Sequence, residues 1–330
     1  MDRILLSGVS SGCGKTTMVC GILQALVNRG LRVGAFKCGP DYIDPMFHSR
    51  IIGAKSANLD LHFFSENTLR YLLAKNAADR DVSIIEGVMG YYDGLGLTST
   101  KASSYEVAQV TDSPVVLVVN AKGASLSVLA VIQGFLNFAP KSNIRGVLLN
   151  QCSPMAYAAL SRAIEERLGV ACYGYLPKME NCSLESRHLG LVTADEVADL
   201  KGKMSALAAQ VEKTVDLDGL LALSRTAPDL AYNPIELPRR EPVRIAVARD
   251  RAFCFYYEDS LEAIREMGGE IVEFSPLKDA VLPEHIQGLY LGGGYPELYA
   301  QALSENASMR SSIKSALESG LPCIAECGGF

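Results

Sequence analysis

The sequence predicts an α/β protein with two domains, the first built on a doubly wound parallel sheet. Three observations support this prediction. Apolar strand-like runs alternate with helical patterns over residues 1–224. A polar stretch with four prolines follows over residues 225–242, and the same alternation then restarts. We therefore expect a first domain over residues 1–224, a linker over 225–242 and a second domain over 243–330.

The elements follow from the apolar runs. In the first domain we expect strands at residues 3–6, 33–36, 82–85, 115–119, 146–149 and 171–175, with helices at 18–27, 157–168 and 195–223. In the second we expect strands at 243–248, 270–274 and 288–291 and a helix at 260–267. Parallel sheets of this kind bind their ligands at the carboxyl ends of the strands, so the polar residues there are the candidate site.

Composition excludes several classes of function. The 330 residues are 48% hydrophobic and 21% charged, as in ordinary globular proteins. A net charge of −6 argues against nucleic acid or an anionic membrane as the main partner. No secretory leader and no apolar run near 20 residues is found, so we expect a cytoplasmic protein. Nine scattered cysteines predict free thiols rather than disulfides or zinc ligands.

A glycine-rich segment, GVSSGCGKTT at residues 8–17, lies between the first strand and the first helix. Such a turn lets backbone N–H groups converge on a phosphate, and the helix N-terminus adds partial positive charge. The spacing is a variant, because the usual glycine position holds Val9 and Gly8 comes one residue earlier. An ordinary glycine turn is the alternative. The residues predicted to bind the nucleotide here are Gly12, Cys13, Gly14, Lys15, Thr16 and Thr17, with Thr16 also a magnesium ligand.

Charged residues follow the next two strands. Pro40 and Pro45 argue against a helix after the second strand, so we expect Lys37, Asp41 and Asp44 on a loop. Glu86 follows the third strand and is our first choice for holding the nucleotide's metal, with Asp41 beside it. For Asp44, and for Asp93 in the turn after Glu86, a solvated turn or a helix cap is an equally good explanation.

Six motifs in order resemble the ATP-dependent amidotransferase family of cobyrinate a,c-diamide synthase. They are GVSSGCGKTT, FKCGPDYIDP, NLD, EGVMGYYDG, GVLLN and RHLGLV, at residues 8–17, 36–45, 58–60, 86–94, 146–150 and 187–192. The amidation domain of that family is similar to dethiobiotin synthetase. The resemblance implies that a substrate carboxylate attacks the γ-phosphate of ATP to give an acyl phosphate, and that ammonia then displaces phosphate to leave an amide.

The resemblance also implies roles for individual residues. Lys15, Lys37 and Mg²⁺ would neutralise the transferred phosphoryl group, with Thr16, Asp41 and Glu86 holding the metal. Asp44 and Asp93 would position the reacting carboxylate or ammonia, and Asn150 would read the adenine. Tyr42 and Arg187 are the candidate contacts to a tetrapyrrole polycarboxylate, since arginine binds carboxylates bidentately.

Three alternatives stay open. Hydrogenobyrinate and nickel sirohydrochlorin are substrates of related enzymes, and the motifs do not separate them from cobyrinate. A different ligase or a non-amidating ATPase or regulatory module would use the same nucleotide site. Related switch ATPases carry a lysine near the start of the loop, where this chain has Ser10, which argues against a dimer switch. A homodimer is neither predicted nor excluded.

The last residues resemble the nucleophile elbow of a class I glutamine amidotransferase. ECGGF at 326–330 follows IAVARDRAFCFYY at 245–257 and LYLGGGYPE at 289–297, which look like the same family's glutaminase half. Cys327 would be the nucleophile, and the N–H groups of Gly293, Gly294 and Gly328 would form the oxyanion hole. No histidine follows Cys327, and His285 is not at a matching position. We therefore expect an incomplete glutaminase half that uses free ammonia but hydrolyses glutamine poorly.

Overall fold

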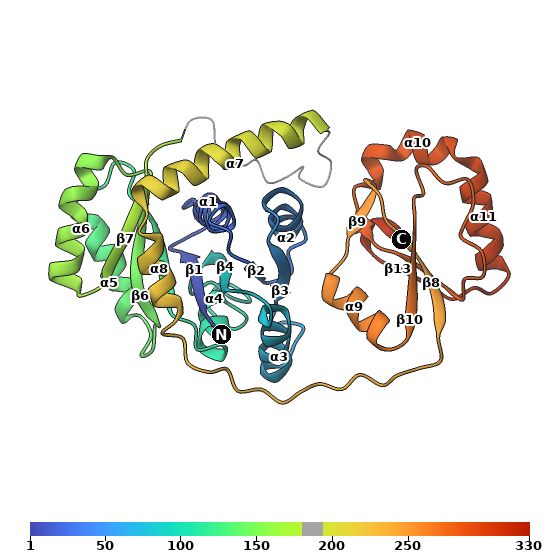
Figure 1. Cartoon of the computed structure of the whole chain (residues 1–330), viewed down its shortest axis with the longest axis horizontal. Coiled ribbons are helices and arrows are strands. Elements are labelled where there is room, and N and C mark those ends of the chain that lie inside the picture. Colours follow the sequence, from blue (N-terminus) through green and yellow to red (C-terminus); the bar gives the residue numbers. More distant parts are fainter. Residues whose placement is uncertain (180–193) are drawn as a thin grey trace. The chain divides into compact units, whose positions relative to one another are not determined.

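The computed structural model describes residues 1–179 and 194–330, and these form two compact units (Figure 1). The described residues up to Pro234 make the first unit, and those from Ile235 onward make the second. Each unit is described by itself. The division falls inside the polar stretch at 225–242, and the bounds given above for the domains stay a prediction.

The first unit is built on a seven-stranded parallel sheet in the order β3-β2-β4-β1-β5-β6-β7. All six residues of β1 are buried, because the strand lies at the centre with helices on both faces. This arrangement confirms the predicted doubly wound fold. The strands are β1 (Arg3–Gly8), β2 (Val33–Cys38), β3 (Lys55–Leu59), β4 (Val82–Gly90), β5 (Val115–Asn120), β6 (Ile144–Asn150) and β7 (Ala171–Leu176).

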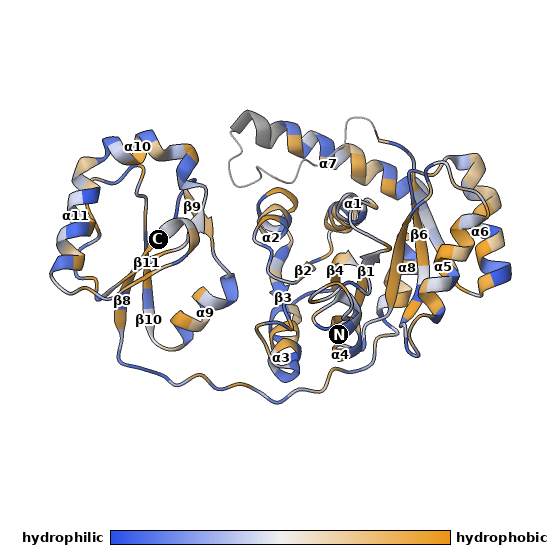
Figure 2. Ribbon diagram, turned by 180° about the vertical axis from the view of Figure 1, so that it is seen from behind, coloured by the Kyte–Doolittle hydropathy of each residue, from blue (hydrophilic) through white to orange (hydrophobic). Residues whose placement is uncertain are grey.

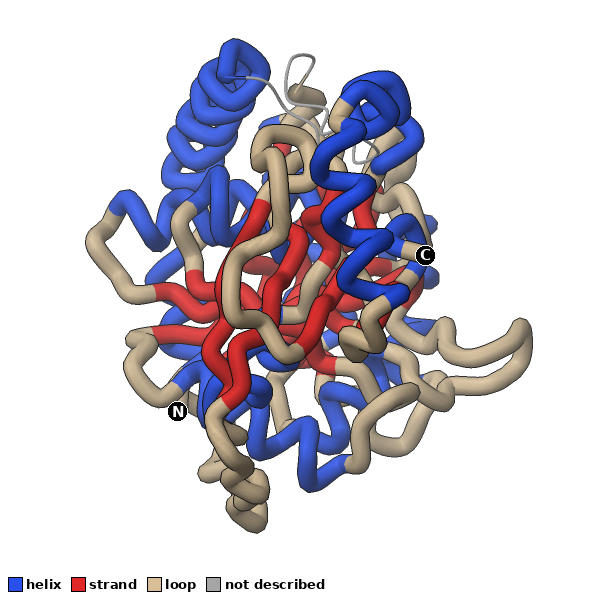
Figure 3. The backbone as a smooth tube through the Cα atoms, turned by 90° about the vertical axis from the view of Figure 1, so that its right-hand side faces the viewer, coloured by secondary structure: helices blue, strands red, loops and turns tan. Residues whose placement is uncertain are grey.

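Helices cover both faces of this sheet, so its strands lie inside. Figure 3 distinguishes the helices and strands of the chain by colour. One face packs against α3, α4, α5 and α6, and the other against α1, α7 and α8. Helix α8 is among the elements coloured hydrophobic in Figure 2. The helices are α1 (Lys15–Asn28), α2 (Ile43–Phe47), the π-helical turn η1 (His48–Ile52), α3 (Glu66–Ala77), α4 (Ser104–Val110), α5 (Ser127–Asn137), α6 (Pro154–Leu168), α7 (Ala194–Thr214) and α8 (Leu217–Ser224).

A short helix, α2, stands where the two prolines led us to expect a loop, so that prediction was wrong. Pro45 is the third residue of α2, a position whose N–H has no partner within a helix. The side chain of Asp41 accepts hydrogen bonds from the backbone N–H groups of Ile43 (2.8 Å) and Asp44 (3.2 Å). The helix therefore starts after Asp41 and carries Asp44 on its first turn.

Further elements differ from the prediction. Helices α3, α4 and α5 were not predicted. Strand β3 was missed because Lys55 and Ser56 are only half-buried at the edge of the sheet, which interrupts the apolar pattern. The helix expected over residues 195–223 is broken into α7 and α8. The break comes at Val215, which forms a β-bridge with Gly174, and the side chain of Asp216 then caps α8 by accepting the N–H of Gly219 at 2.8 Å.

A buried arginine joins three segments of the first unit. Arg3 on β1 is fully buried, and its guanidinium donates to the carbonyls of Thr111 (2.9 Å), Met1 (3.1 Å) and Pro228 (2.8 Å). Thr111 ends α4, and Pro228 follows α8. The segment after α8 is thus tied to the first strand by a hydrogen bond to a charged group.

The second unit holds a four-stranded parallel sheet in the order β10-β8-β11-β13 and a small antiparallel pair, β9 with β12. An apolar hollow of about 580 Å³ lies between α9 and this sheet. The elements are β8 (Val243–Ala248), β9 (Phe253–Phe255), α9 (Glu258–Glu266), β10 (Gly269–Phe274), β11 (Gly288–Leu291), β12 (Gly293–Gly294), the 3₁₀ turn η3 (Pro296–Tyr299), α10 (Ala300–Glu305), α11 (Ala307–Glu318), β13 (Cys323–Ala325) and the 3₁₀ turn η4 (Cys327–Gly329).

Residues 1–179 and 194–330 include eight cysteines, all of them free thiols. Within the same residues no cluster of three or more acidic, histidine or cysteine side chains is arranged to hold a metal ion. None of the helices described there combines the length and the low polarity that crossing a bilayer requires.

Candidate active site

The glycine-rich loop joins β1 to α1, and its shape depends on a close contact with β6. Gly14 caps α1 with φ 90°, in the left-handed region that favours glycine. A Cβ atom on Gly14 would lie only 1.8 Å from Nδ2 of Asn150. That amide, at the end of β6, donates a hydrogen bond to the carbonyl of Cys13 at 2.9 Å. Asn150 therefore supports the backbone of the loop, a contact that its motif did not reveal.

We expect Gly14→Ala to weaken nucleotide binding, because the new Cβ forces both the loop and Asn150 to move. Gly30→Ala is the matched control, since Gly30 has φ 82° but no atom of the described residues lies within 4 Å of its Cβ position. The control should lower the free energy of unfolding by only about 1–2 kcal/mol, the cost of placing alanine in the left-handed conformation. Urea unfolding and titration with a fluorescent ATP analogue measure the two effects. Equal nucleotide affinities for the two variants would contradict this account.

Four charged side chains meet at the carboxyl edge of β2 and β4. Lys37 pairs in register with Glu86 on the neighbouring strand, so their side chains lie on the same face. Nζ of Lys37 lies 3.0 Å from Oε1 of Glu86, 2.5 Å from Oδ2 of Asp44 and 4.0 Å from Oδ2 of Asp41. Lys37 and Glu86 are 4% and 0% exposed. We call these four residues the lysine-carboxylate cluster.

The cluster keeps its two central groups charged. Burial acts to lower the pKa of Lys37, but the carboxylates of Glu86 and Asp44 outweigh it and hold that pKa above its ordinary value. Burial likewise acts to raise the pKa of Glu86, and Lys37 and His48 hold it below its usual range. Asp44 differs, because burial and the nearby Glu86 raise its pKa to about 6. One acid of the cluster therefore exchanges its proton near neutral pH.

The raised pKa of Asp44 predicts a dependence of stability on pH. The pKa is about 6 in the folded chain and 3.8 in a model peptide, so between these values the folded state binds more protons than the unfolded state. The contribution of Asp44 to stability is therefore greatest below about pH 4 and is lost as the pH rises to about 6. Asp44→Asn should remove this loss. Urea midpoints at pH 4.5 and 6.5 test it, and an equal change with pH in both proteins would contradict it.

Two residues at the start of α1 reach the same edge. The Thr16 hydroxyl donates to Oε1 of Glu86 at 2.7 Å. Lys15 is 8% exposed, and its ammonium donates to the carbonyl of Met89 at 3.0 Å rather than to a carboxylate. Burial and the nearby Lys37 lower the pKa of Lys15. A buried ammonium held by a neutral carbonyl is suited to bind an incoming anion.

The other residues predicted for the site are not members of the lysine-carboxylate cluster. Oδ2 of Asp93 accepts the N–H of Gly90 at 2.8 Å, so Asp93 closes the turn after β4, one of the two explanations considered from the sequence. Tyr42 directly precedes α2 and is half-buried. Thr17 follows Thr16 on α1. Arg187 lies outside the described residues.

Two residues near the cluster were given no role from the sequence. Asn58 on β3 donates from Nδ2 to the carbonyls of Gly39 (3.0 Å) and Asp41 (2.7 Å), which fixes the segment before α2. His48, the first residue of η1, is fully buried with Nε2 at 3.3 Å from Oε2 of Glu86. The NLD motif drew attention to Asn58, whereas nothing in the sequence pattern indicated that His48 faces Glu86.

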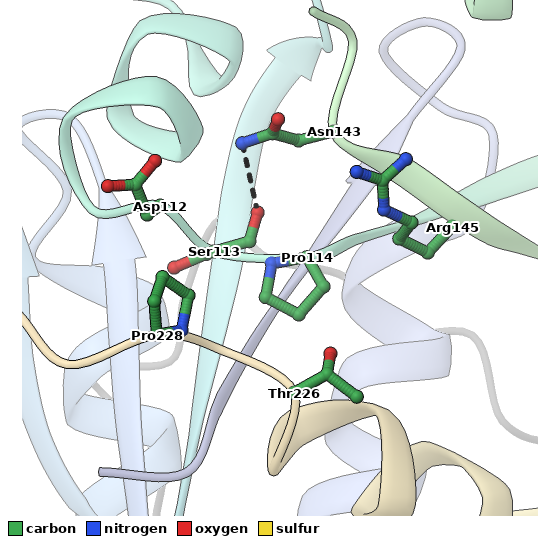
Figure 4. A pocket seen from close by; sticks show the side chains of 7 residues that line it. All are labelled: Asp112, Ser113, Pro114, Asn143, Arg145, Thr226 and Pro228. Carbon is green, nitrogen blue, oxygen red and sulfur yellow. Dashed lines mark hydrogen bonds between the residues drawn. The ribbon is translucent and has the colours of Figure 1, made fainter.

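A polar cavity of about 220 Å³ lies at the opposite, amino edge of the sheet (Figure 4). Its walls come from the starts of β5 and β6 and from the segment after α8. Asp112, Ser113, Pro114, Asn143, Arg145, Thr226 and Pro228 line it. No residue of the glycine-rich loop or of the lysine-carboxylate cluster is among them, which separates this cavity from the candidate active site.

In the second unit, Cys327 lies on a tight turn after β13. Its φ of 52° is unusual for a residue other than glycine, and its side chain is exposed. A Cβ on Gly293 would lie 3.4 Å from Sγ of Cys327, and a Cβ on Gly328 would lie 3.7 Å from the backbone nitrogen of Gly294. The structure therefore brings together the thiol and the three glycines predicted to serve it. Gly292 is excluded as a donor, because its N–H already donates to the Tyr256 hydroxyl at 2.8 Å.

His285 is placed at the other edge of the same sheet. It precedes β11, whereas Cys327 follows β13, and these two strands run parallel. The side chain of His285 is 85% exposed and lies 3.9 Å from a carboxylate oxygen of Glu284. His285 is therefore not placed to act as a base for Cys327.

Comparisons with known proteins match two different family models to two parts of the chain. A family model described as the CobQ/CobB/MinD/ParA nucleotide binding domain matches residues 4–192, and one described as the CobB/CobQ-like glutamine amidotransferase domain matches residues 244–330. The cobyrinate a,c-diamide synthase of Listeria monocytogenes serotype 4b (strain F2365) is 44% identical over 334 residues, which is 100% of this chain and 74% of the relative. The chain belongs to the cobyrinate a,c-diamide synthase family.

Other members of the cobyrinate a,c-diamide synthase family are equally similar. The one from Caldanaerobacter subterraneus subsp. tengcongensis is 44% identical over 327 residues, covering 99% of this chain and 72% of the relative. Membership makes the chain an amidotransferase of the ligase class, with a nucleotide-binding domain that implies ATP use. Among solved structures, the cell division protein MinD of Aquifex aeolicus aligns with 71% of this chain and 100% of its own at 15% identity and TM-score 0.41, too low to support a function.

Proposed function

We propose that this chain uses magnesium-bound ATP to convert side-chain carboxylates of cobyrinate, at the a and c positions, into primary amides. Curated relatives at 40–45% identity are named for that reaction. The observation that carries the proposal is the lysine-carboxylate cluster, because it shares a sheet edge with the glycine-rich loop and meets Thr16 through Glu86. A site with two buried ammonium groups beside a phosphate-binding loop suits phosphoryl transfer.

The oxygen atoms of Thr16, Glu86 and Asp41 suit Mg²⁺, which prefers oxygen ligands and keeps several waters and substrate phosphates around it. Within residues 1–179 and 194–330, Oε2 of Glu86 is buried and forms no aligned hydrogen bond, with Nε2 of His48 at 3.3 Å. A carboxylate oxygen has two lone pairs, so Oε2 can face His48 and still have capacity for a metal ion. A sparse protein ligand set is consistent with the absence of a three-ligand cluster from residues 1–179 and 194–330. When bound, Mg²⁺ would neutralise charge on the β- and γ-phosphate oxygens.

The proposed reaction has two steps, and neither needs a protein nucleophile. In the first, an oxygen of the substrate carboxylate bonds to the γ-phosphorus of ATP, and the bond from that phosphorus to the oxygen of ADP breaks. Lys15 and Lys37 neutralise the negative charge on the phosphoryl group. In the second, ammonia attacks the acyl carbon and phosphate leaves with the bonding electrons. Asp44, with its pKa of about 6, would accept the proton that the nitrogen releases.

A substrate panel tests the proposal. Cobyrinate, hydrogenobyrinate and nickel sirohydrochlorin are each incubated with ATP, Mg²⁺ and ammonium, and ADP release is measured together with product mass. We expect ADP release only with a tetrapyrrole and a mass change of two amidations on cobyrinate. Amidation of another member of the panel would correct the substrate and keep the chemistry. ATP cleavage at the same rate without any tetrapyrrole would overturn the amidation and favour a non-amidating ATPase.

We expect Cys327→Ser to leave ammonium-driven amide formation unchanged, because the thiol belongs to the second unit and ammonium bypasses glutamine hydrolysis. Any amide formation that glutamine supports in the unmodified chain should be lost in Cys327→Ser, because the thiol is the proposed nucleophile. Cys323→Ser is the matched control, since Cys323 is also an exposed thiol. Product formation with each nitrogen donor measures both effects. Glutamine-driven amide formation that persists in Cys327→Ser, or loss of the ammonium-driven rate in that variant, would contradict this assignment.

A further inference from the structure

Glu86 has one oxygen with two hydrogen bonds and one that, among the described residues, has none. Oε1 accepts hydrogen bonds from Thr16 (2.7 Å) and Lys37 (3.0 Å). Oε2 lies 3.3 Å from Nε2 of His48, without the alignment of a formed hydrogen bond. Both side chains are fully buried. The two oxygens of Glu86 thus have different neighbours: Oε1 contacts Thr16 and Lys37, and Oε2 contacts the imidazole of His48.

His48 is held in place by its surroundings. Its carbonyl accepts the N–H of Ala54 at 3.0 Å, and η1 packs against α1, α2, β3 and α7. Among the residues that the structure describes, neither ring nitrogen of His48 has an aligned hydrogen-bond partner. A phenylalanine or leucine would fill such a space without burying two polar atoms, so packing alone does not account for a histidine here.

We propose that His48 is a positioning residue for the nucleotide site. Nε2 of its imidazole donates to Oε2 of Glu86 and stops the carboxylate from rotating, which keeps Oε1 directed at Thr16 and Lys37. Groups that orient a metal ligand from behind affect metal affinity by about 10–100-fold. The inference rests on the proposed role of Glu86 toward Mg²⁺, and it adds a residue that no motif of the sequence marked.

Four variants test the inference. His48→Phe keeps a ring and removes the donor, and Phe47→Leu alters the adjacent buried side chain while leaving His48 in place. His48→Gln places an amide nitrogen near the position of Nε2, whereas His48→Asn places one near Nδ1. For each variant, ATP affinity is measured by calorimetry with Mg²⁺ and again with EDTA, and thermal unfolding is recorded alongside.

We expect His48→Phe to weaken ATP binding about 10–100-fold with Mg²⁺ and less than about threefold with EDTA. His48→Gln should bind Mg²⁺-ATP within about threefold of the unmodified chain and His48→Asn should not, since only the glutamine amide reaches Oε2. Phe47→Leu should lower the unfolding temperature and keep the full gain in affinity that Mg²⁺ gives.

Three results would overturn the inference. They are unchanged Mg²⁺-ATP affinity in His48→Phe, an equal loss with Mg²⁺ and with EDTA, and equal affinities for the glutamine and asparagine variants. If His48→Phe does not fold, the comparison of glutamine with asparagine decides alone. An unmodified chain whose affinity for ATP is the same with Mg²⁺ and with EDTA would instead overturn the proposed metal role of Glu86, and the inference with it.

Discussion

Replacing Lys37 by methionine is expected to lower the free energy of unfolding of the first unit by about 3–5 kcal/mol, the usual cost of removing one partner from a buried ion pair. The substitution leaves Glu86 and Asp44 buried without the ammonium that contacts both of them. Urea unfolding, followed by circular dichroism, measures the change. The effect is large because Glu86 is fully buried and has no access to water.

Lys15→Met is the matched control for this prediction, because the same chemical change removes a lysine that is buried nearby. The ammonium of Lys15 contacts a carbonyl, and burial lowers its pKa, so folding gains little from its charge. We expect its stability to stay within about 1 kcal/mol of the unmodified chain, because the substitution leaves no buried carboxylate without its partner and removes a charge that burial disfavours. Equal losses in the two variants would refute the distinction between the two lysines.

Lys15→Met is itself expected to lower the rate of amide formation by about 10²–10³-fold, the loss typical of removing one group that stabilises developing charge. Lys15 lies at the start of α1, where the glycine-rich loop and the helix N-terminus meet. ADP release and product mass with cobyrinate and ammonium measure the rate. The folded fraction is checked by the unfolding curve of the same preparation.

Lys141→Met controls for the loss of a positive charge, since Lys141 is exposed in the turn before β6. Its rate should match that of the unmodified chain. If Lys15→Met kept more than about a tenth of the rate, the glycine-rich loop would not be acting as the phosphate site that the proposal requires.

The fold was largely predictable because its strands are buried on both faces. Strands of this kind read as continuous apolar runs, and β1, β2 and β5 were found in that way within two residues of their ends. The sequence also predicted that Lys37 and Glu86 lie at the same edge of the sheet, whereas their direct contact depends on the pairing of β2 with β4, which was not predicted.

The remaining features depend on tertiary contacts that no local pattern encodes. Helix α2 starts where the Asp41 side chain accepts the first N–H groups, and the Asp41 carbonyl is itself held by Asn58 from a strand that the apolar pattern did not reveal. The approach of His48 to Glu86 depends on how η1 packs, and the contact of Asn150 with Cys13 joins residues 137 positions apart in the chain. The sequence predicted that charged residues gather at a sheet edge, but it did not indicate which neighbouring side chains contact them.

The anchoring of Arg3 sets a practical limit on dissecting this enzyme. One guanidinium nitrogen uses the carbonyl of Pro228, four residues beyond the end of α8. An isolated nucleotide-binding fragment cut at Ser224 would take away the acceptor of that nitrogen and the chain that covers it, whereas a fragment extended to Pro234 would keep both. Expression of the shorter fragment should therefore yield more aggregated protein than the longer one, although both contain every helix and strand of the sheet layer.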